Sequence, residues 1–130
     1  MNYRQLLFAA GFFGATGVAA GAFGAHALRE FLLERGMTTA WETAARYQLL
    51  HAVALFAAAA WMRPATGGSR RYVGWAALCW CAGIVLFSGS LYGLAVGGPR
   101  WLGPVTPLGG VAFLVGWACV CAAALAKEEA

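Results

Sequence analysis

The sequence predicts an all-α integral membrane protein, a four-helix bundle made of two antiparallel transmembrane hairpins. Two observations lead to this fold. First, 62% of the 130 residues are hydrophobic and 11% are charged, a composition more apolar than that of soluble globular proteins. Second, the charged residues bracket four stretches without Asp, Glu, Lys or Arg, and a helix of about 20 apolar residues crosses a bilayer. The alternating segments of a transmembrane β-barrel do not occur.

These stretches place four spans within a single membrane domain, residues 1–130. The spans are expected at about residues 5–28, 43–62, 72–96 and 105–126. The first helix is expected to continue to about residue 35, beyond the membrane, because its apolar stripe persists and no turn signal precedes Gly36. The second span is the shortest, and it requires Arg46 and Arg63 to extend their side chains to the two interfaces.

Turn and capping residues separate the predicted helices. Gly36 is expected to cap the end of the first helix, and Thr39 with Glu42 fits the capping box that opens the second. Residues 63–71 contain Pro and paired Gly and form a loop. Residues 97–99, Gly-Gly-Pro, end the third helix.

The distribution of basic residues favours both termini on the cytoplasmic side. With the N-terminus inside, five basic residues lie inside and four outside. The inside set is Arg4, Arg63, Arg70, Arg71 and Lys127; the outside set is Arg29, Arg35, Arg46 and Arg100. The compact loop 63–71 also carries no acidic residue. Because the basic residues sit singly or in pairs at span ends, the net charge of +4 indicates topology rather than nucleic-acid binding.

Glycine-rich helix packing is the second structural expectation. Gly14, Gly17, Gly21 and Gly24 recur along one face of the first helix, and Gly89, Gly93 and Gly97 form a row on the third. Such faces let helix backbones approach closely in lipid, within one bundle or between two copies of the chain.

Polar residues inside the spans gather in the outer half of the predicted bundle. They are His26, Tyr47, Gln48, His51, Ser88, Ser90, Tyr92 and Thr106. With the first hairpin turning near Met37, His26 comes level with about Gln48. These groups either hydrogen-bond one another and stabilise the bundle, or form a site for a lipid-soluble ligand such as a quinone. Two histidines could also ligate haem, but their expected depths differ by a helical turn.

The sequence disfavours several other kinds of chemistry. No carboxylate lies within a span, which argues against a proton-coupled pump. The inner halves of the helices offer no continuous polar path for a channel or transporter. Cys79 with Cys81, and Cys119 with Cys121, lie two residues apart, so on a helix their side chains point about 200° apart and no metal site is expected. The sequence requires no cofactor and identifies no catalytic residue.

Four motifs resemble those of a known family. They are residues 21–26 (Gly-Ala-Phe-Gly-Ala-His), the Tyr47-Gln48-x-x-His51-Ala52 step, residues 87–92 (Phe-Ser-Gly-Ser-Leu-Tyr), and residues 103–110 with Thr106 between two prolines. In this order they resemble the domain-of-unknown-function family 423, also described as transmembrane-protein-256-like. The resemblance implies a small multi-pass protein of the bacterial cytoplasmic (inner) membrane, and it implies no activity.

The sequence therefore favours a non-enzymatic membrane protein, either an accessory subunit or a binder of a lipid-like molecule through the outer-leaflet polar cluster. One alternative is a redox-associated component that binds quinone or haem, and another is a small channel or transporter. Expected partners are membrane lipid, a lipid-soluble ligand, a second copy of the chain or a larger membrane complex, and no nucleic acid.

Overall fold

The computed structural model describes residues 1–126, and all regular structure in this range is helical. The helices are α1 (Tyr3–Ala25), α2 (Arg29–Glu34), α3 (Thr38–Met62), α4 (Gly67–Gly83), the π-helix η1 (Ile84–Ser88), α5 (Gly89–Ala95) and α6 (Leu102–Leu125). The all-α prediction is confirmed. Lys127 and the end of the chain, predicted to be cytoplasmic, lie outside the described residues.

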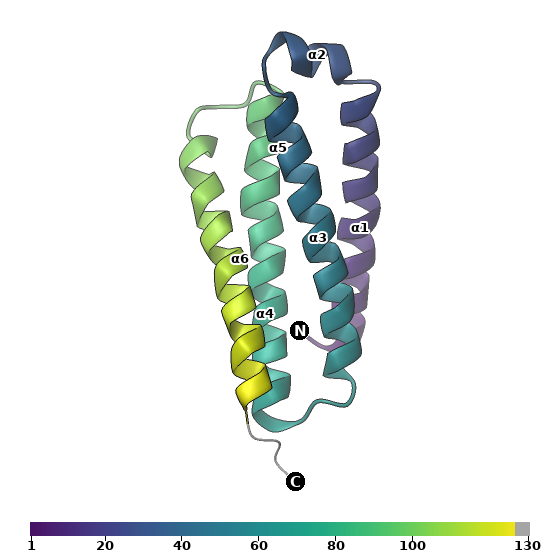
Figure 1. Ribbon diagram of the computed structural model, residues 1–130, viewed down its shortest axis with the longest axis vertical. Helices are drawn as coiled ribbons and strands as arrows, with labels where there is room; N and C mark the ends of the chain where they lie inside the picture. The colour runs from purple at the N-terminus through teal and green to yellow at the C-terminus, as the bar shows by residue number, and fades with distance from the viewer. Residues whose placement is uncertain (127–130) are drawn as a thin grey trace.

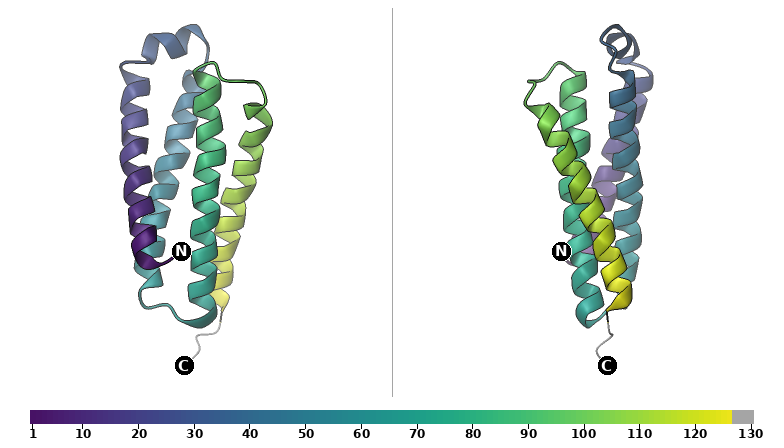
Figure 2. Two further views of the ribbon diagram at one scale, coloured as in Figure 1. Left: turned by 180° about the vertical axis from the view of Figure 1, so that it is seen from behind. Right: turned by 60° about the vertical axis from the view of Figure 1, so that its left-hand side comes forward.

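The long helices lie side by side along the long axis of the molecule (Figures 1 and 2). α1 packs along α3, and α4 packs along α6. α4, η1 and α5 follow one another as a single rod, and α3 contacts this rod as well as α1, so it joins the two pairs. α1 and the α4–α5 rod run towards the end that carries α2, whereas α3 and α6 run back (Figure 1).

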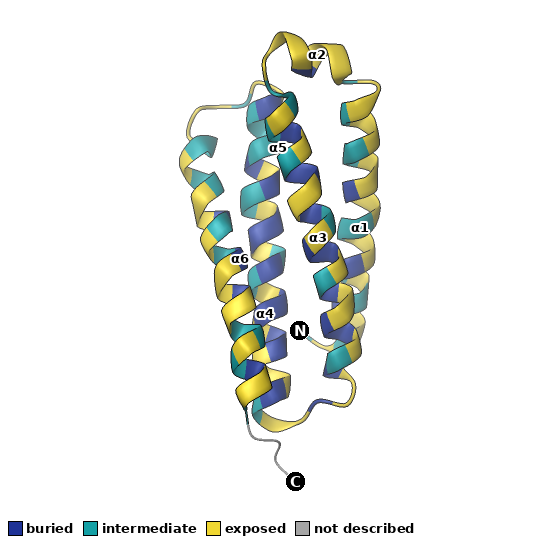
Figure 3. Ribbon diagram, in the orientation of Figure 1, coloured by how far each residue is buried: buried dark blue, intermediate teal, exposed yellow. Residues whose placement is uncertain are grey.

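Three helical segments of the described chain are long and apolar enough to cross a membrane: Tyr3–Ala25, Gly67–Ala95 and Leu102–Leu125. α3, which contains the second expected span, is not among them, because Glu42, Arg46, Gln48 and His51 reduce its apolar character. Large apolar side chains point outward from the other helices: Phe8 is 76% exposed and Leu114 is 71% exposed. Figure 3 shows such exposed positions along the outer faces of the long helices.

Glycines permit close helix contacts at some of the expected positions. A Cβ atom at Gly17 would lie 2.9 Å from Leu49 of α3, and one at Gly24 would overlap the Trp41 ring. By contrast, Gly14 and Gly89 face open space. Gly109 of α6 was not among the glycines expected to permit close packing, yet a Cβ atom there would overlap the backbone of Phe87.

The structure corrects the prediction that the first helix continues to residue 35. α1 ends at Ala25, and after a turn the chain forms the short helix α2, which lies across one end of the molecule (Figure 1). A straight helix would have carried Leu32 into water. The turn instead buries Leu32 to 1% exposure against Trp41 and Ala95, and this burial of apolar surface favours the bent path.

Gly36 ends a helix as predicted, but that helix is α2 and not a continuation of the first helix, and the predicted capping box of α3 does not form. Gly36 has a φ of +65°, and Met37 N–H donates to Leu32 O at 2.9 Å while Gly36 N–H donates to Leu33 O at 3.0 Å, as in a Schellman motif. Because α3 begins at Thr38, directly after this turn, Thr39 lies inside its first turn and cannot cap it. Met37 is the N-cap and makes no side-chain cap hydrogen bond.

Candidate functional site

Three side chains from three helices form the centre of the polar cluster. Gln48 of α3 donates through Nε2 to Thr16 Oγ1 at 2.8 Å and to Phe13 O at 3.0 Å, both on α1. Tyr92 of α5 donates to Gln48 Oε1 at 3.0 Å. Thr16 in turn donates to Phe12 O at 2.8 Å. We call Thr16, Gln48 and Tyr92 the polar trio; its members link α1, α3 and α5 through donated hydrogen bonds.

The donors of the polar trio are all engaged. Gln48 uses both amide hydrogens, and the hydroxyls of Thr16 and Tyr92 each use one. An amide oxygen and a phenol oxygen each keep acceptor capacity beyond these bonds. The trio can therefore accept a hydrogen bond from a ligand more readily than it can donate one.

His51 is buried and bonded at both ring nitrogens. Its Nδ1 lies 2.8 Å from Tyr47 O, and Trp117 Nε1 of α6 donates to its Nε2 at 3.2 Å. Since a carbonyl oxygen only accepts, these contacts assign the neutral tautomer with the proton on Nδ1. The ring also stacks on Phe113, with centroids 3.7 Å apart. His51 thus has no free ring nitrogen to ligate haem iron or another metal ion.

The two serines and Thr106 make hydrogen bonds within the α4–α5 rod and to the helices beside it. Ser88 donates to Ala44 O of α3 at 2.8 Å. Ser90 donates to Phe87 O at 3.0 Å, and its Oγ lies 2.7 Å from Thr106 Oγ1 of α6. These bonds join the α4–α5 rod to α3 and α6, and they are separate from the polar trio.

Tyr47 lies at the rim of the cluster rather than inside it. The side chain is 42% exposed, and its ring packs 4.8 Å from Phe87 and 6.0 Å from Phe113. It covers the His51 side of the cluster with an aromatic surface.

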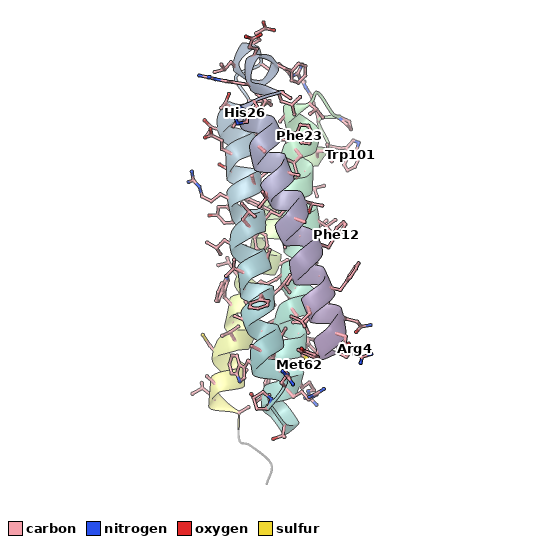
Figure 4. The ribbon with its side chains drawn as sticks, turned by 90° about the vertical axis from the view of Figure 1, so that its right-hand side faces the viewer. Arg4, Phe12, Phe23, His26, Met62 and Trp101 are labelled. Atoms are coloured by element: carbon pink, nitrogen blue, oxygen red, sulfur yellow. The ribbon has the colours of Figure 1, made fainter. Side chains whose placement is uncertain are left out.

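The structure does not bring His26 to the other predicted site residues. His26 is exposed at the end of α1, beside α2 (Figure 4). The expected register placed it level with Gln48, but Gln48 contacts Phe13 and Thr16 instead. The reason is that residues 26–37 form the turn after α1, the short helix α2 and the turn before α3. They therefore do not extend α1 and α3 alongside each other.

Sequence reasoning missed three residues of the cluster. Thr16 is the sole Ser or Thr of α1, a signal that was present in the sequence. Trp117 and Trp41 were less apparent, because an indole within a span or near its end is ordinarily an interface or packing residue. Trp41 donates to Ala20 O at 2.8 Å and packs against the Tyr92 ring with centroids 4.7 Å apart.

A pocket of about 330 Å³ opens beside the polar trio, between α1 and the α4–α5 rod. Its lining residues are Phe12, Phe13, Thr16, Ala20, Gln48, Ile84, Val85, Gly89 and Tyr92. Phe12, Val85 and Gly89 are exposed at its mouth. The π-helix η1 contributes Ile84 and Val85, and single π-helical turns are frequent at functional sites.

No group of three or more His, Cys, Asp or Glu side chains comes together among the described residues. All four cysteines are free thiols. The arrangement thus offers an apolar pocket with hydrogen-bond acceptors at one wall and no set of metal ligands in the described part of the chain.

The fold and the site define a helical membrane protein whose intramembrane polar groups are bonded to one another beside a small apolar pocket. The chain belongs to the family described as protein of unknown function (DUF423), which matches residues 20–110. The predicted family is confirmed.

Relatives from bacteria and from a yeast are similar over most of their length. The chain is 43% identical over 109 residues to the UPF0382 membrane protein YwdK of Bacillus subtilis (strain 168). The aligned region covers 83% of this chain and 85% of that protein. The chain is 38% identical over 130 residues to the UPF0382 inner membrane protein YgdD of Escherichia coli (strain K12), covering 96% and 92%. It is 36% identical over 110 residues to a UPF0382 membrane protein of Schizosaccharomyces pombe, covering 81% and 88%. No solved structure matches the chain.

These names and the apolar helices confirm the prediction of an inner-membrane protein.

Proposed function

We propose that this chain is a non-enzymatic four-span membrane protein that binds a lipid-like molecule beside the polar trio. The fourth span is α3. α1 and the α4–α5 rod are both candidate spans and run in the same direction. The chain between them must therefore return across the membrane, and α3 (Thr38–Met62) is the segment that does so. Gln48 and His51 of α3 are buried against neighbouring helices, which is where intramembrane polar groups are tolerated, while Glu42 and Arg46 are exposed nearer the α2 end.

Both termini lie on the cytoplasmic side in this proposal. The end of the molecule that carries Arg4 and the loop between α3 and α4 holds four arginines and no acidic residue of the described chain. The opposite end holds Arg29, Arg35 and Arg100 together with Glu30 and Glu34. An excess of Arg in a short loop favours its retention in the cytoplasm.

The single observation that carries the ligand proposal is that the polar trio lines a pocket with an otherwise apolar wall. Because the donors of Thr16, Gln48 and Tyr92 are engaged, the ligand that fits is an apolar molecule with a hydroxyl or amide donor. Such a donor would bond to Tyr92 Oη or to the second lone pair of Gln48 Oε1. A quinone, whose carbonyls only accept, fits this wall less well than its reduced quinol form.

The test uses a substitution that fills the pocket without disturbing its neighbours. A Cβ atom at Gly89 would meet nothing within 4 Å, so Gly89→Leu places a side chain in the pocket. Gly11→Leu is the matched control, since Gly11 is equally unobstructed and faces the separate groove between α1 and α3. Native mass spectrometry and an absorption spectrum would be recorded on each protein after gentle release from its own membrane.

We expect the wild type and Gly11→Leu to retain one bound lipid-like mass and Gly89→Leu to lose it. A spectrum with a quinone or haem band would move the protein into the redox-associated class. A wild-type protein that carries no bound molecule would contradict the proposal and favour a purely structural role for the polar trio.

A further inference from the structure

Among the described residues, the end of the molecule opposite α2 holds four arginines and no carboxylate. Arg4 is the second residue of α1, Arg63 follows α3, and Arg70 and Arg71 are the fourth and fifth residues of α4. The acidic residues within the described chain are Glu30, Glu34 and Glu42, all at the α2 end. Figure 4 shows Arg4 and Met62 at this end of the molecule and His26 at the other. The positive end therefore has no carboxylate of the described residues to neutralise it.

Two of the four arginines contact the protein itself. Arg70 Nη1 donates to Met62 O at 3.1 Å, which satisfies a carbonyl at the end of α3. Arg63 lies over the Tyr3 ring, 5.2 Å from its centroid. Arg4 lines a pocket between α1 and α4. Arg71, together with Arg70, lines a second pocket between α4 and the side of Met1 and Met62.

These pockets adjoin, because Met1 and Leu78 line both. The one nearer the positive end, about 340 Å³, has Arg71 and Trp75 in its wall. The other, about 560 Å³, runs between Arg4 and the apolar residues Phe8, Ala9 and Cys81. Together they form a groove, here called the α1/α4 groove, that is cationic at one end and apolar at the other.

The length of the groove matches one leaflet of a bilayer. Arg71 and Cys81 are ten residues apart on one helix, which is about 15 Å at the helical rise per residue. The hydrocarbon core of a bilayer is roughly 30 Å thick, so one leaflet accounts for about 15 Å. A lipid with its headgroup at Arg71 and Arg4 would place its chains along Leu78, Phe8 and Cys81.

We propose that the α1/α4 groove binds an anionic phospholipid of the adjacent leaflet. The phosphate lies between the guanidinium groups of Arg4 and Arg71, which match phosphate in charge and geometry. An acyl chain follows the apolar part of the groove. This site lies at the opposite end from most of the polar cluster, and it does not depend on the ligand proposed above.

The test compares two lipids with the same acyl chains. The full chain in neutral detergent is titrated with dioleoyl phosphatidylglycerol or dioleoyl phosphatidylcholine, and bound lipid is counted by native mass spectrometry. We expect the wild type to prefer phosphatidylglycerol. Removing two arginines from a membrane-surface site should lower the affinity of Arg4→Gln/Arg71→Gln for phosphatidylglycerol about thirtyfold. Phosphatidylcholine binding should not change.

Two further variants keep the test decisive. Arg29→Gln/Arg100→Gln removes the same charge from the other end and should bind as the wild type does. Arg4→Lys/Arg71→Lys keeps the charge and should retain most of the preference, even if the glutamine variant folds poorly. Equal binding of the two lipids by the wild type, or an equal loss in the Arg29/Arg100 control, would overturn the proposal. Displacement of phosphatidylglycerol by inorganic phosphate alone would overturn it as well, because the site would then bind a free anion.

Discussion

The indole N–H of Trp117 on α6 donates to Nε2 of His51 on α3 at 3.2 Å. This bond and the contact of Nδ1 with Tyr47 O use both nitrogens of a histidine that is 2% exposed. An intramembrane histidine is a functional candidate by default; here both ring nitrogens are engaged, and the bond to Trp117 connects the two helix pairs.

A double-mutant cycle measures this link. Trp117→Phe removes the donor and His51→Phe removes the acceptor while keeping an aromatic ring against Phe113. We expect a coupling of about 0.6 kcal/mol between the two positions, the average for hydrogen bonds between membrane helices. Unfolding in mixed micelles is the measurement. Additive effects of the two substitutions would mean that the bond contributes nothing to stability.

The two histidines should behave differently when each is replaced by alanine. His26 is exposed at the end of α1, so His26→Ala should change the free energy of unfolding by less than about 0.5 kcal/mol. His51→Ala removes the stack on Phe113 and strands the Trp117 donor, and it should cost about 2 kcal/mol or more. A similar loss of stability in both variants would contradict the exposed position of His26 at the end of α1.

Gln48 should be the most sensitive member of the polar trio. Gln48→Leu keeps the size of the side chain but leaves the Tyr92 hydroxyl without its acceptor and Phe13 O and Thr16 Oγ1 without its donors. We expect a loss of about 1–2 kcal/mol in the free energy of unfolding, since each bond between membrane helices contributes about 0.6 kcal/mol. Tyr92→Phe, which removes one bond, is the graded comparison and should cost less. An equal cost for both variants would mean that the bonds from Gln48 to Phe13 O and Thr16 Oγ1 add nothing to stability.

The sequence predicted the helical class and most of the polar residues, because charge-free length and intramembrane polarity are properties of the residues themselves. It did not predict their pairing. His26 was placed near Gln48 by folding the hairpin about Met37, whereas the burial of Leu32 turns the chain early and shifts α3 against α1. The capping box was misplaced for a related reason, since the turn at Gly36 leads directly into Thr38. Such tertiary preferences are not encoded in local spacing.

The proposed path of α3 can be tested with single cysteines. In a background lacking Cys79, Cys81, Cys119 and Cys121, Glu34→Cys would mark the α2 end and Thr66→Cys the loop before α4; both positions are exposed. A thiol reagent that does not cross membranes should label residue 34 and not residue 66 in intact cells. Labelling of both residues from the same side would exclude α3 as a span. Labelling of residue 66 alone would reverse the proposed orientation.

Neighbouring glycines of α6 should differ in their tolerance of a methyl group. A Cβ atom at Gly109 would overlap the backbone of Phe87, which cannot rotate away, whereas one at Gly110 would approach the Phe87 side chain no closer than 3.9 Å. Gly109→Ala should therefore push α6 away from η1 and destabilise the protein by about 1–3 kcal/mol, as overpacking does. Gly110→Ala should be neutral or slightly stabilising, because alanine favours the helix over glycine.

Unfolding of the two variants in mixed micelles measures the difference. Equal stability would mean that α6 does not approach η1 as closely as this packing requires, and the Ser90 to Thr106 contact would then need another explanation.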